Sequence, residues 1–274
     1  MGVFGVEQSP NGVWFGTFNS LTEYRRELIH GISTRLGGKS KSPFATLNLG
    51  LHIGDEADTV WYNRQEFCSA VGISAEKMVT ADQVHGDNIA VVTVGDAGRG
   101  AKHYSEAIGG TDALITNVPG IPLMLFFADC VPVLIFDPIK KAIGISHAGW
   151  KGTVSKIAQK TVLALSSQYG TRPSDCLAVI GPSIGPCCYE VDEAVMSRLR
   201  AEFTYWQDLV TPVGDRWKLD LWETNKRQLI DIGVKSDNVE KSSVCTACNT
   251  SIFFSHRAEA GRTGRLGAVI ALAR

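Results

Sequence analysis

Four short apolar segments lie close together in the middle of the chain, and they constrain the fold more than any other feature. They cover Asp112 to Thr116, Pro122 to Phe127, Val131 to Phe136 and Ala142 to Ser146. Each has the β-branched and aromatic content of a strand, with turn formers between them. Polar residues do not alternate with apolar ones along these segments. The sequence therefore predicts strands whose two faces are both buried.

Other segments predict a mixture of strands and helices within one continuous domain, residues 1–274, because no repeat, linker or low-complexity stretch divides the chain. Apolar spacing predicts helices from Asp55 to Val71, with Asp58 as the cap, and from about Val154 to Tyr169. The segment from Thr34 to Gly54 is rich in Gly, Ser, Asn and Pro and predicts a long ordered loop. Further strands are expected at Val13–Phe18, Ile29–Ser33, Met78–Ala81, Ile89–Val94, Leu177–Ile180 and Ala268–Ala271.

The charge balance excludes a protein that binds nucleic acid or an anionic membrane through a global basic field. Lys and Arg number 27 against 28 Asp and Glu, which gives a net charge of −1. No apolar run approaches the roughly 18 residues of a membrane span, and the first ten residues lack the basic start of a signal peptide. We therefore expect a cytoplasmic protein. Its near-neutral charge and apolar strands permit a monomer or a dimer, and we favour a monomer. Seven cysteines in a chain of this size then indicate thiols, metal ligands or catalysis.

His85, Cys130 and His147 are the strongest candidates for a metal site. Each follows or ends a predicted strand beside glycine residues. Catalytic zinc takes three ligands from His, Cys, Asp and Glu and keeps a fourth position open, which lowers the pKa of a bound water to about 7. The spacing alone is weak, so two loop histidines and a buried thiol without a metal remain the alternative. Asp129 is a candidate acid or base, or a carboxylate that only orients a ligand.

A second group of residues could hold an anion. Gly149 to Thr153 leads into the predicted helix at 154–169, and the free N–H groups of a helix start favour phosphate. The segment is not a Walker A motif, and a turn that merely needs glycine explains it equally well. Arg35 lies in the glycine-bearing loop, and Arg257, Arg262 and Arg265 cluster near the end of the chain. Guanidinium groups bind phosphate bidentately, although solvated surface charge is the alternative for each of them.

The remaining cysteines are predicted to be structural thiols. Cys187 and Cys188 are adjacent, and Cys245 and Cys248 form a CxxC. A structural zinc site would need ligand pairs at matched spacing, and a vicinal pair is not a usual half-site. Redox activity is a minor alternative. Cys68 and Cys176 fall within predicted packed elements.

Several strings that occur together make the chain resemble the YfiH/YlmD family of bacterial purine nucleoside phosphorylases, also described as a laccase or polyphenol oxidase domain. The resemblance covers essentially the whole chain, and the order of Gln-Val-His-Gly, Ala-Asp-Cys and His-Ala-Gly-Trp is highly specific. The strings are Ser33–Gly38, Asn48–Gly50, Gln83–Gly86, Thr111–Leu114, Ala128–Pro132, His147–Gly152, Gly181–Gly185 and Thr263–Arg265.

The resemblance implies an α+β sandwich of mixed sheets flanked by helices, with zinc bound by His85, Cys130 and His147. It also implies phosphorolysis of adenosine, inosine, guanosine and methylthioadenosine to free base and ribose 1-phosphate, with deamination of adenosine. For this activity we expect the metal ligands and Asp129 to be catalytic. We expect the phosphate or substrate to be held by some of Arg35, Asn48, Lys151, Arg257 and Arg265.

Three other functions use the same residues. A multicopper laccase needs many His ligands, and the chain has six in total, so a full copper set cannot be built, although a single copper could replace zinc in the triad. Cys130 could instead be a nucleophile with His147 as its base, as in cysteine hydrolases. A binding module without turnover is the least favoured, because it has no need of an open metal position.

Overall fold

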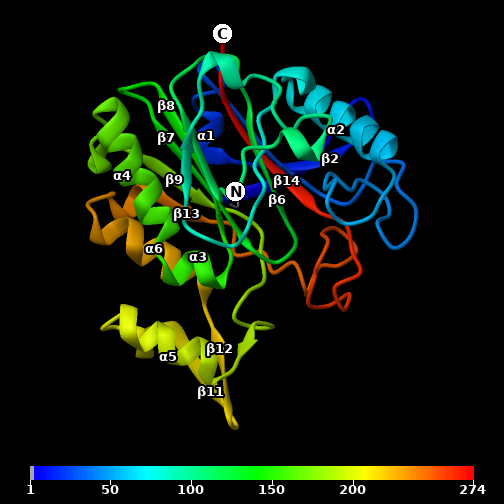
Figure 1. The fold of residues 1–274 in the computed structure, drawn as a ribbon. Helices are drawn as coiled ribbons and strands as arrows, with labels where there is room; N and C mark the ends of the chain where they lie inside the picture. Colours follow the sequence, from blue (N-terminus) through cyan, green and yellow to red (C-terminus); the bar gives the residue numbers. More distant parts are fainter. Residues whose placement is uncertain (1–2) are drawn as a thin grey trace.

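The structure is a computed structural model that describes residues 3–274, and it has two β-sheets packed face to face between layers of helices (Figure 1). The five-stranded sheet has the order β1-β2-β3-β14-β6, and all its strands are antiparallel. It is assembled from distant parts of the chain. The strands are β1 (Phe4–Gln8), β2 (Trp14–Phe18), β3 (Leu28–Ser33), β6 (Leu123–Phe127) and β14 (Leu266–Leu272).

The six-stranded sheet has the order β13-β9-β7-β8-β5-β4 and is mixed. Its two edge pairs are parallel and its inner pairs are antiparallel. The strands are β4 (Ile89–Val91), β5 (Ala113–Thr116), β7 (Val131–Asp137), β8 (Ala142–Ala148), β9 (Leu177–Ile180) and β13 (Val239–Lys241). The predicted α+β sandwich is thus confirmed, with one mixed and one antiparallel sheet.

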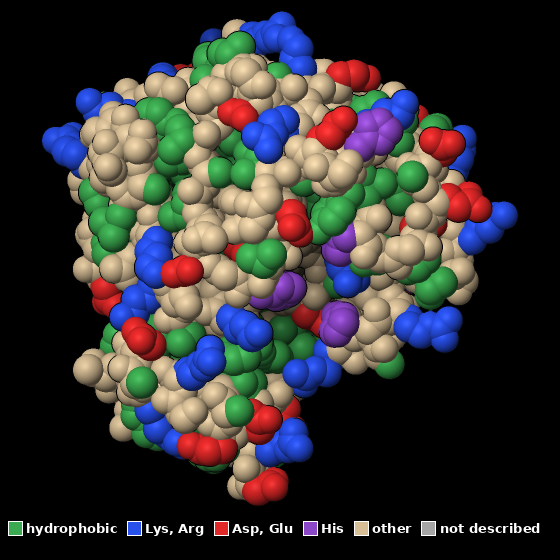
Figure 2. All heavy atoms as spheres, viewed as in Figure 1, with side chains coloured by type: hydrophobic (Ala, Val, Ile, Leu, Met, Phe, Trp, Pro, Cys, Tyr) green, Lys and Arg blue, Asp and Glu red, His purple; other side chains and the backbone are tan. Residues whose placement is uncertain are grey.

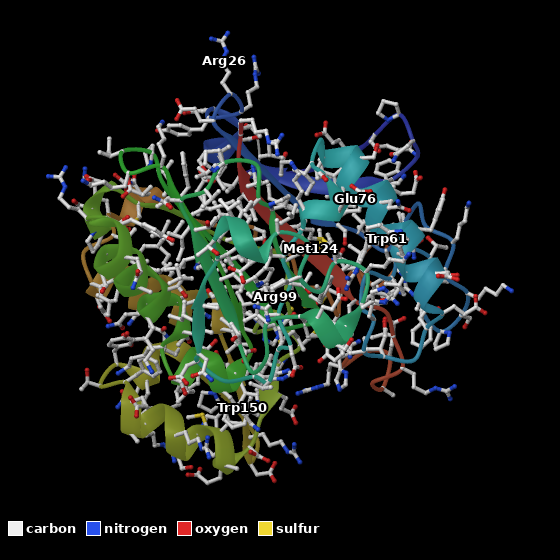
Figure 3. The ribbon with its side chains drawn as sticks, turned by 45° about the horizontal axis from the view of Figure 1, so that its top comes forward. Arg26, Trp61, Glu76, Arg99, Met124 and Trp150 are labelled. Atoms are coloured by element: carbon white, nitrogen blue, oxygen red, sulfur yellow. The ribbon has the colours of Figure 1, made fainter. Side chains whose placement is uncertain are left out.

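The alternation of side chains explains why the central strands have no polar face. In β7, Leu134 and Phe136 point into the core between the two sheets, while Val133 and Ile135 point to the helices on the other side. In β6, Leu125 likewise belongs to the core between the sheets. Its neighbours Met124 and Phe126 face α2 (Ala57–Val71), below which Figure 3 shows Met124. Both faces of the four central strands β5, β6, β7 and β8 are therefore buried, as the sequence predicts.

Helices cover the outer face of each sheet. The helices α4 (Ile157–Tyr169) and α6 (Leu221–Asp231) lie on the six-stranded sheet, and α2 lies on the five-stranded sheet (Figure 1). A third, small sheet of order β10-β12-β11 projects below the sandwich together with α5 (Glu193–Glu202). The remaining elements are α1 (Asn19–Thr22), α3 (Trp150–Val154), β10 (Glu190–Val191), β11 (Val210–Val213) and β12 (Arg216–Leu219), with 3₁₀ turns at Ala75–Lys77, Val94–Asp96, Tyr104–Glu106, Pro173–Asp175, Trp206–Leu209 and Ser236–Asn238.

Some predicted boundaries are wrong. The helix expected from about Val154 to Tyr169 is found as α4 but begins at Ile157, because Lys156 adopts a left-handed backbone with φ of 63°. The glycine-rich segment expected to lead into it forms a separate short helix, α3. The Met78–Ala81 segment forms only isolated bridges, and β4 ends at Val91. Asp58 lies in the first turn of α2, whose N-cap is Glu56 without a side-chain cap. The expected long loop is confirmed between β3 and α2. Within residues 3–274 no helix is long and apolar enough to cross a membrane.

Candidate active site

Three loop and strand ends bring His85, Cys130 and His147 together at one end of the six-stranded sheet. Cys130 immediately precedes β7. His147 is the next-to-last residue of β8, the antiparallel partner of β7, and pairs with Pro132. The strand predicted to end at Ser146 is therefore two residues longer, and His147 lies inside it rather than after it. The Cys130 Sγ and one ring nitrogen of each histidine all lie within 4.8 Å of one another. The structure thus assembles the predicted triad from residues far apart in the sequence.

Asp112 holds two members of the triad in place. Its side chain is fully buried, and its Oδ1 lies 2.8 Å from His147 Nδ1. The same carboxylate accepts the backbone N–H groups of His85, at 3.0 Å, and Gly86, at 2.7 Å. With Nδ1 engaged, the Nε2 atom of His147 is the nitrogen free to face Cys130. Sequence reasoning did not select Asp112 as a functional residue, although its string contributes to the family resemblance.

The triad favours a thiolate beside a charged imidazole. Burial opposes ionisation of the Cys130 thiol, but His147 and His85 outweigh it and lower the pKa of Cys130 to about 6. Burial likewise opposes a charge on His147, but Cys130 and Asp112 outweigh it and raise the pKa of His147 to about 9. A thiolate is the form of cysteine that binds metals and attacks electrophiles.

The backbone around the triad is specialised for close approach. A Cβ atom on Gly149 would lie 3.0 Å from Cys130 Sγ and 3.3 Å from the His85 ring, so only glycine leaves this space free. His85 and Asp129 both adopt left-handed backbone conformations, with φ of 61° and 79°. Residues other than glycine adopt this conformation uncommonly, and such residues tend to cluster at functional sites.

A pocket of about 430 Å³ opens over the triad. Figure 2 shows histidine side chains around a hollow on this face, and Figure 3 shows Trp150 between the sheets and α5. The lining of the pocket combines apolar and aromatic side chains with charged groups, which is the usual composition of a small-molecule site. The lining residues are His52, Gln83, His85, Phe126, Ala128, Asp129, Cys130, His147, Gly149, Trp150, Ile184, Tyr189, Leu221, His256, Arg257 and Arg265.

Asp129 lines the pocket with both carboxylate oxygens already engaged. One accepts the hydroxyl of Thr246 at 2.7 Å, and the other accepts the backbone N–H of Arg257 at 2.6 Å. These contacts tie the segment that carries Cys130 to two loops near the end of the chain. Of the two roles open to Asp129 from sequence, this geometry suits the orienting carboxylate better.

Two of the five predicted phosphate or substrate ligands line the pocket, namely Arg257 and Arg265. Arg35 is not among the lining residues, because its guanidinium pairs with Glu259 at 3.0 Å and donates to backbone carbonyls. Asn48 is fully buried and accepts the backbone N–H of Arg265 at 2.9 Å. Lys151 is exposed on α3, outside the lining.

Sequence reasoning also missed pocket residues on other elements. Gln83 makes a paired hydrogen bond with the backbone of Phe126, donating at 2.9 Å and accepting at 2.8 Å. His52 comes from the long loop and His256 from the segment before β14. The sequence predicts a long ordered loop around His52, but nothing in the local sequence indicates that this loop and the segment of His256 meet at one pocket.

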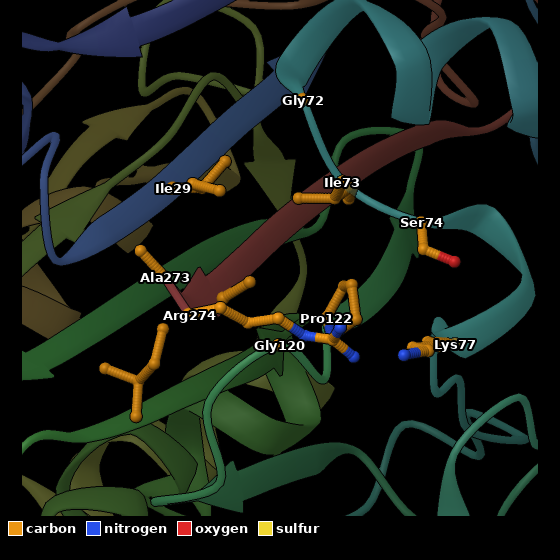
Figure 4. Close-up of a pocket in the computed structure, with 11 residues that line it drawn as sticks. Ile29, Gly72, Ile73, Ser74, Lys77, Gly120, Pro122, Ala273 and Arg274 are labelled. Atoms are coloured by element: carbon orange, nitrogen blue, oxygen red, sulfur yellow. The ribbon is translucent and has the colours of Figure 1, made fainter.

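A separate hollow of about 390 Å³ lies at the other end of the sandwich (Figure 4). Ala271 to Arg274 line it, whereas Arg265, just before β14, lines the triad pocket. The two hollows are therefore at opposite ends of β14. The hollow in Figure 4 contains no His, Cys, Asp or Glu among its lining residues, so the triad pocket is the candidate active site.

Known proteins resemble this chain over nearly its full length. Residues 29–273 match the family model described as multi-copper polyphenol oxidoreductase laccase. The purine nucleoside phosphorylase YlmD of Bacillus subtilis is 38% identical over 96% of this chain and 95% of its own. The enzyme of the same name from Geobacillus stearothermophilus is 41% identical over 88% of this chain and 89% of its own.

Solved structures agree with these matches. The crystal structure of Bacillus licheniformis YfiH, described as a hypothetical protein, has a TM-score of 0.91 at 37% identity and covers 97% of this chain and 98% of its own. The structure of YlmD from Geobacillus stearothermophilus has a TM-score of 0.84 at 39% identity and covers 90% and 92%. The chain therefore belongs to the laccase-domain family that includes YfiH and YlmD, in which relatives are named purine nucleoside phosphorylase.

Proposed function

We propose that the protein is a zinc-dependent purine nucleoside phosphorylase. It would cleave adenosine, inosine, guanosine and methylthioadenosine with phosphate to the free base and ribose 1-phosphate. The observation that carries the proposal is a single pocket that contains both a metal-type triad and two guanidinium groups. The names of the full-length relatives support the same activity. All seven cysteines are free thiols, which suits the reducing cytoplasm, and we propose that compartment for the reaction.

The triad residues fit a zinc ion. Two imidazoles and one thiolate are a usual set of three protein ligands for catalytic zinc, and the pocket leaves a fourth side open to a ligand. Asp112 fixes the ring of His147 through Nδ1, as carboxylates commonly do behind a histidine that binds zinc. Bound zinc would supply Lewis acidity and a water of lowered pKa, the chemistry that deamination of adenosine requires, and we include that activity in the proposal.

Phosphate would be held by Arg257 and Arg265. Both line the pocket, and the backbone N–H of each is fixed, by Asp129 in one case and by Asn48 in the other. Arg265 is half-buried, so its charge acts in a region of reduced solvent screening. Cleavage of the glycosidic bond builds positive charge on the sugar, and a phosphate dianion held against that face stabilises it.

The purine would lie against the apolar wall of the pocket. Phe126 and Trp150 offer aromatic surfaces, and Ile184 and Leu221 complete an apolar wall. A flat heteroaromatic ring gains both burial and stacking energy there. The volume of about 430 Å³ is in the range of pockets that bind small molecules.

The test is to incubate metal-quantified protein with adenosine, with and without phosphate, and to separate adenine, hypoxanthine, inosine and ribose 1-phosphate by chromatography. We expect adenine and ribose 1-phosphate only with phosphate, and we expect both activity and bound zinc to fall in Cys130→Ala. The matched control is Cys68→Ala, which removes a buried thiol of α2, away from the pocket. Zinc-loaded protein that leaves every nucleoside intact would refute the proposal.

A cysteine hydrolase is the second candidate. Cys130 could be the nucleophile, His147 its base, and Asp112 the carboxylate that orients the base. Metal analysis separates the two: protein without zinc whose Cys130 reacts rapidly with a thiol reagent would favour the hydrolase. A multicopper oxidase has less support. Within residues 3–274 the second group of metal-type donors contains only cysteines, and a laccase needs several histidine-rich copper centres. A single copper replacing zinc in the triad would give at most phenol oxidation in the presence of added copper.

A further inference from the structure

Two pairs of cysteines that lie far apart in the sequence meet at the surface beside the pocket. Cys187 and Cys188 lie between β9 and β10, and Cys245 and Cys248 follow β13. Their sulfur atoms all lie within 4.8 Å of one another. Cys248 Sγ is 3.5 Å from Cys187 Sγ and 3.3 Å from Cys188 Sγ. The sequence predicts separate structural thiols, and the fold instead collects them in one cluster.

The turn before the vicinal pair explains how adjacent residues can face one centre. The backbone N–H groups of Cys188 and Tyr189 both donate to the carbonyl of Gly185, which curls the chain around this point. The N–H of Gly185 in turn donates to Cys245 Sγ at 3.3 Å. Backbone N–H groups aimed at sulfur stabilise a thiolate, the form in which cysteine binds a metal.

The size of the cluster matches a tetrahedral metal site. A Zn–S bond of about 2.3 Å in a regular tetrahedron places neighbouring sulfurs about 3.8 Å apart. The shorter separations in the cluster lie just below this value, and the upper limit of 4.8 Å lies above it. A disulfide would require about 2.05 Å, so the cluster holds four separate thiols.

We propose that Cys187, Cys188, Cys245 and Cys248 bind a second zinc ion as a tetrathiolate site, separate from the triad. Four sulfur ligands with no oxygen or nitrogen donor select a soft, tetrahedral ion, for which zinc is the usual choice in a structural role. All four positions would be filled by protein, so the site would be closed to substrate and structural. It would also occupy two exposed thiols, those of Cys187 and Cys248.

The zinc would clamp a loop that lines the pocket to a second loop that contacts a pocket residue. Tyr189, next to Cys188, lines that pocket. Thr246, inside the CxxC, donates to Asp129, the residue before Cys130. Ile184 also lines the pocket, and its N–H donates to the carbonyl of Asp129 at 3.0 Å. Loss of this zinc should therefore loosen both loops while the triad keeps its own metal.

The experiment is to purify the protein under reducing conditions from zinc-supplemented medium and to measure bound metal per chain. We expect two zinc ions in wild type, one in Cys248→Ser and one in Cys130→Ser. A matched control is Cys176→Ser, a buried thiol outside both groups, which should retain two. Cobalt substitution gives an independent readout: the intense thiolate-to-cobalt absorption of a tetrathiolate should persist in Cys130→Ser and weaken strongly in Cys248→Ser, where the single triad thiolate still contributes.

Hydrogen exchange measures the clamp itself. Chelation of the second zinc should speed exchange in residues 181–189 and 242–248. Two results would overturn the proposal: a single zinc in wild type that is lost in Cys130→Ser, or disulfides among the four cysteines with no second metal. Wild type and Cys130→Ser leave the cluster intact, so the test holds even if Cys248→Ser fails to fold. It is also independent of whether the enzyme cleaves nucleosides.

Discussion

Replacing Asp112 by asparagine tests how the triad is held, because the structure allows the new amide only two orientations and both are unfavourable. In one, the amide NH₂ group faces His147 Nδ1 and the N–H of His85. His147 must then accept through Nδ1 and carry its proton on Nε2, which can no longer bind a metal. Disruption of such an outer-shell partner typically lowers metal affinity 10- to 100-fold, about 1.4–2.7 kcal/mol.

In the other orientation, the NH₂ group faces the backbone N–H groups of Gly86 and Val84. In the wild-type protein these groups donate to the Asp112 carboxylate at 2.7 and 3.2 Å. A fully buried N–H left without an acceptor costs about 1–3 kcal/mol of folding stability, and water reduces this cost at these part-buried groups. The variant therefore loses either metal affinity by the factor given above or about 1 kcal/mol of stability or more.

The assay measures zinc affinity by chelator competition in a Cys248→Ser background, so that only the triad contributes, together with urea unfolding of the metal-free protein. Asp137→Asn is the matched control. Asp137 is equally buried at the far end of β7, where one carboxylate oxygen accepts two backbone N–H groups and the other has no partner. Its asparagine can keep both hydrogen bonds, so we expect both measurements to stay near their starting values. The reasoning would be refuted if Asp112→Asn kept zinc affinity within twofold and stability within about 0.5 kcal/mol.

Three further substitutions test other parts of the structure. Gly149→Ala should lower triad zinc affinity at least fivefold because its Cβ would lie 3.0 Å from the triad sulfur, whereas Gly109→Ala, with nothing within 4 Å of the new atom, should leave it unchanged in the same chelator titration. Arg265→Ala should raise KM for phosphate about tenfold or more and KM for the nucleoside much less, and an equal rise in both constants in steady-state kinetics would contradict the phosphate role. Burial lowers the pKa of His30 to about 4, so stability should be greatest above pH 6.5 and fall by about 3 kcal/mol between pH 6.5 and pH 4, as the unfolded chain binds a proton that the folded one refuses. His30→Asn should flatten this acid limb in urea titrations, and an unchanged slope would show that other groups cause it.

The sequence predicts the central strands well because their signal is local. Buried strands such as Val131–Asp137 need apolar β-formers at every position, and that pattern is visible without knowing their partners. The break between α3 and α4 has no such signal, since Ser155 and Lys156 are ordinary helix residues. The reason for the break lies in tertiary packing. A Cβ on Gly152 would lie 3.1–3.2 Å from the carbonyls of Gly86 and His147, so α3 must run tightly against the triad backbone.

The candidate site divides in the same way. Residue chemistry nominates His85, Cys130 and His147, and the family resemblance strengthens that choice, because ligand types are visible in the sequence. Asp112 and the cysteine cluster are visible only once strands and loops are placed in space. Arg35 is the reverse case: it is a conspicuous arginine in a glycine-bearing loop, but its guanidinium pairs with Glu259 and it does not line the pocket.

The position of β14 has a consequence for how the nascent chain acquires its site. This strand lies between β3 and β6, and its register joins Ala268 to Ile32 and Leu266 to Phe127. During synthesis both partner strands emerge from the ribosome long before β14, so their edges stay open until almost the whole chain is made. Pairing over such separations is slow, and Arg265 enters the pocket only when β14 docks. The pocket should therefore be completed in one of the last steps of folding. Chains whose synthesis stalls before β14 should expose the unpaired edges of β3 and β6, which can pair with other chains and aggregate.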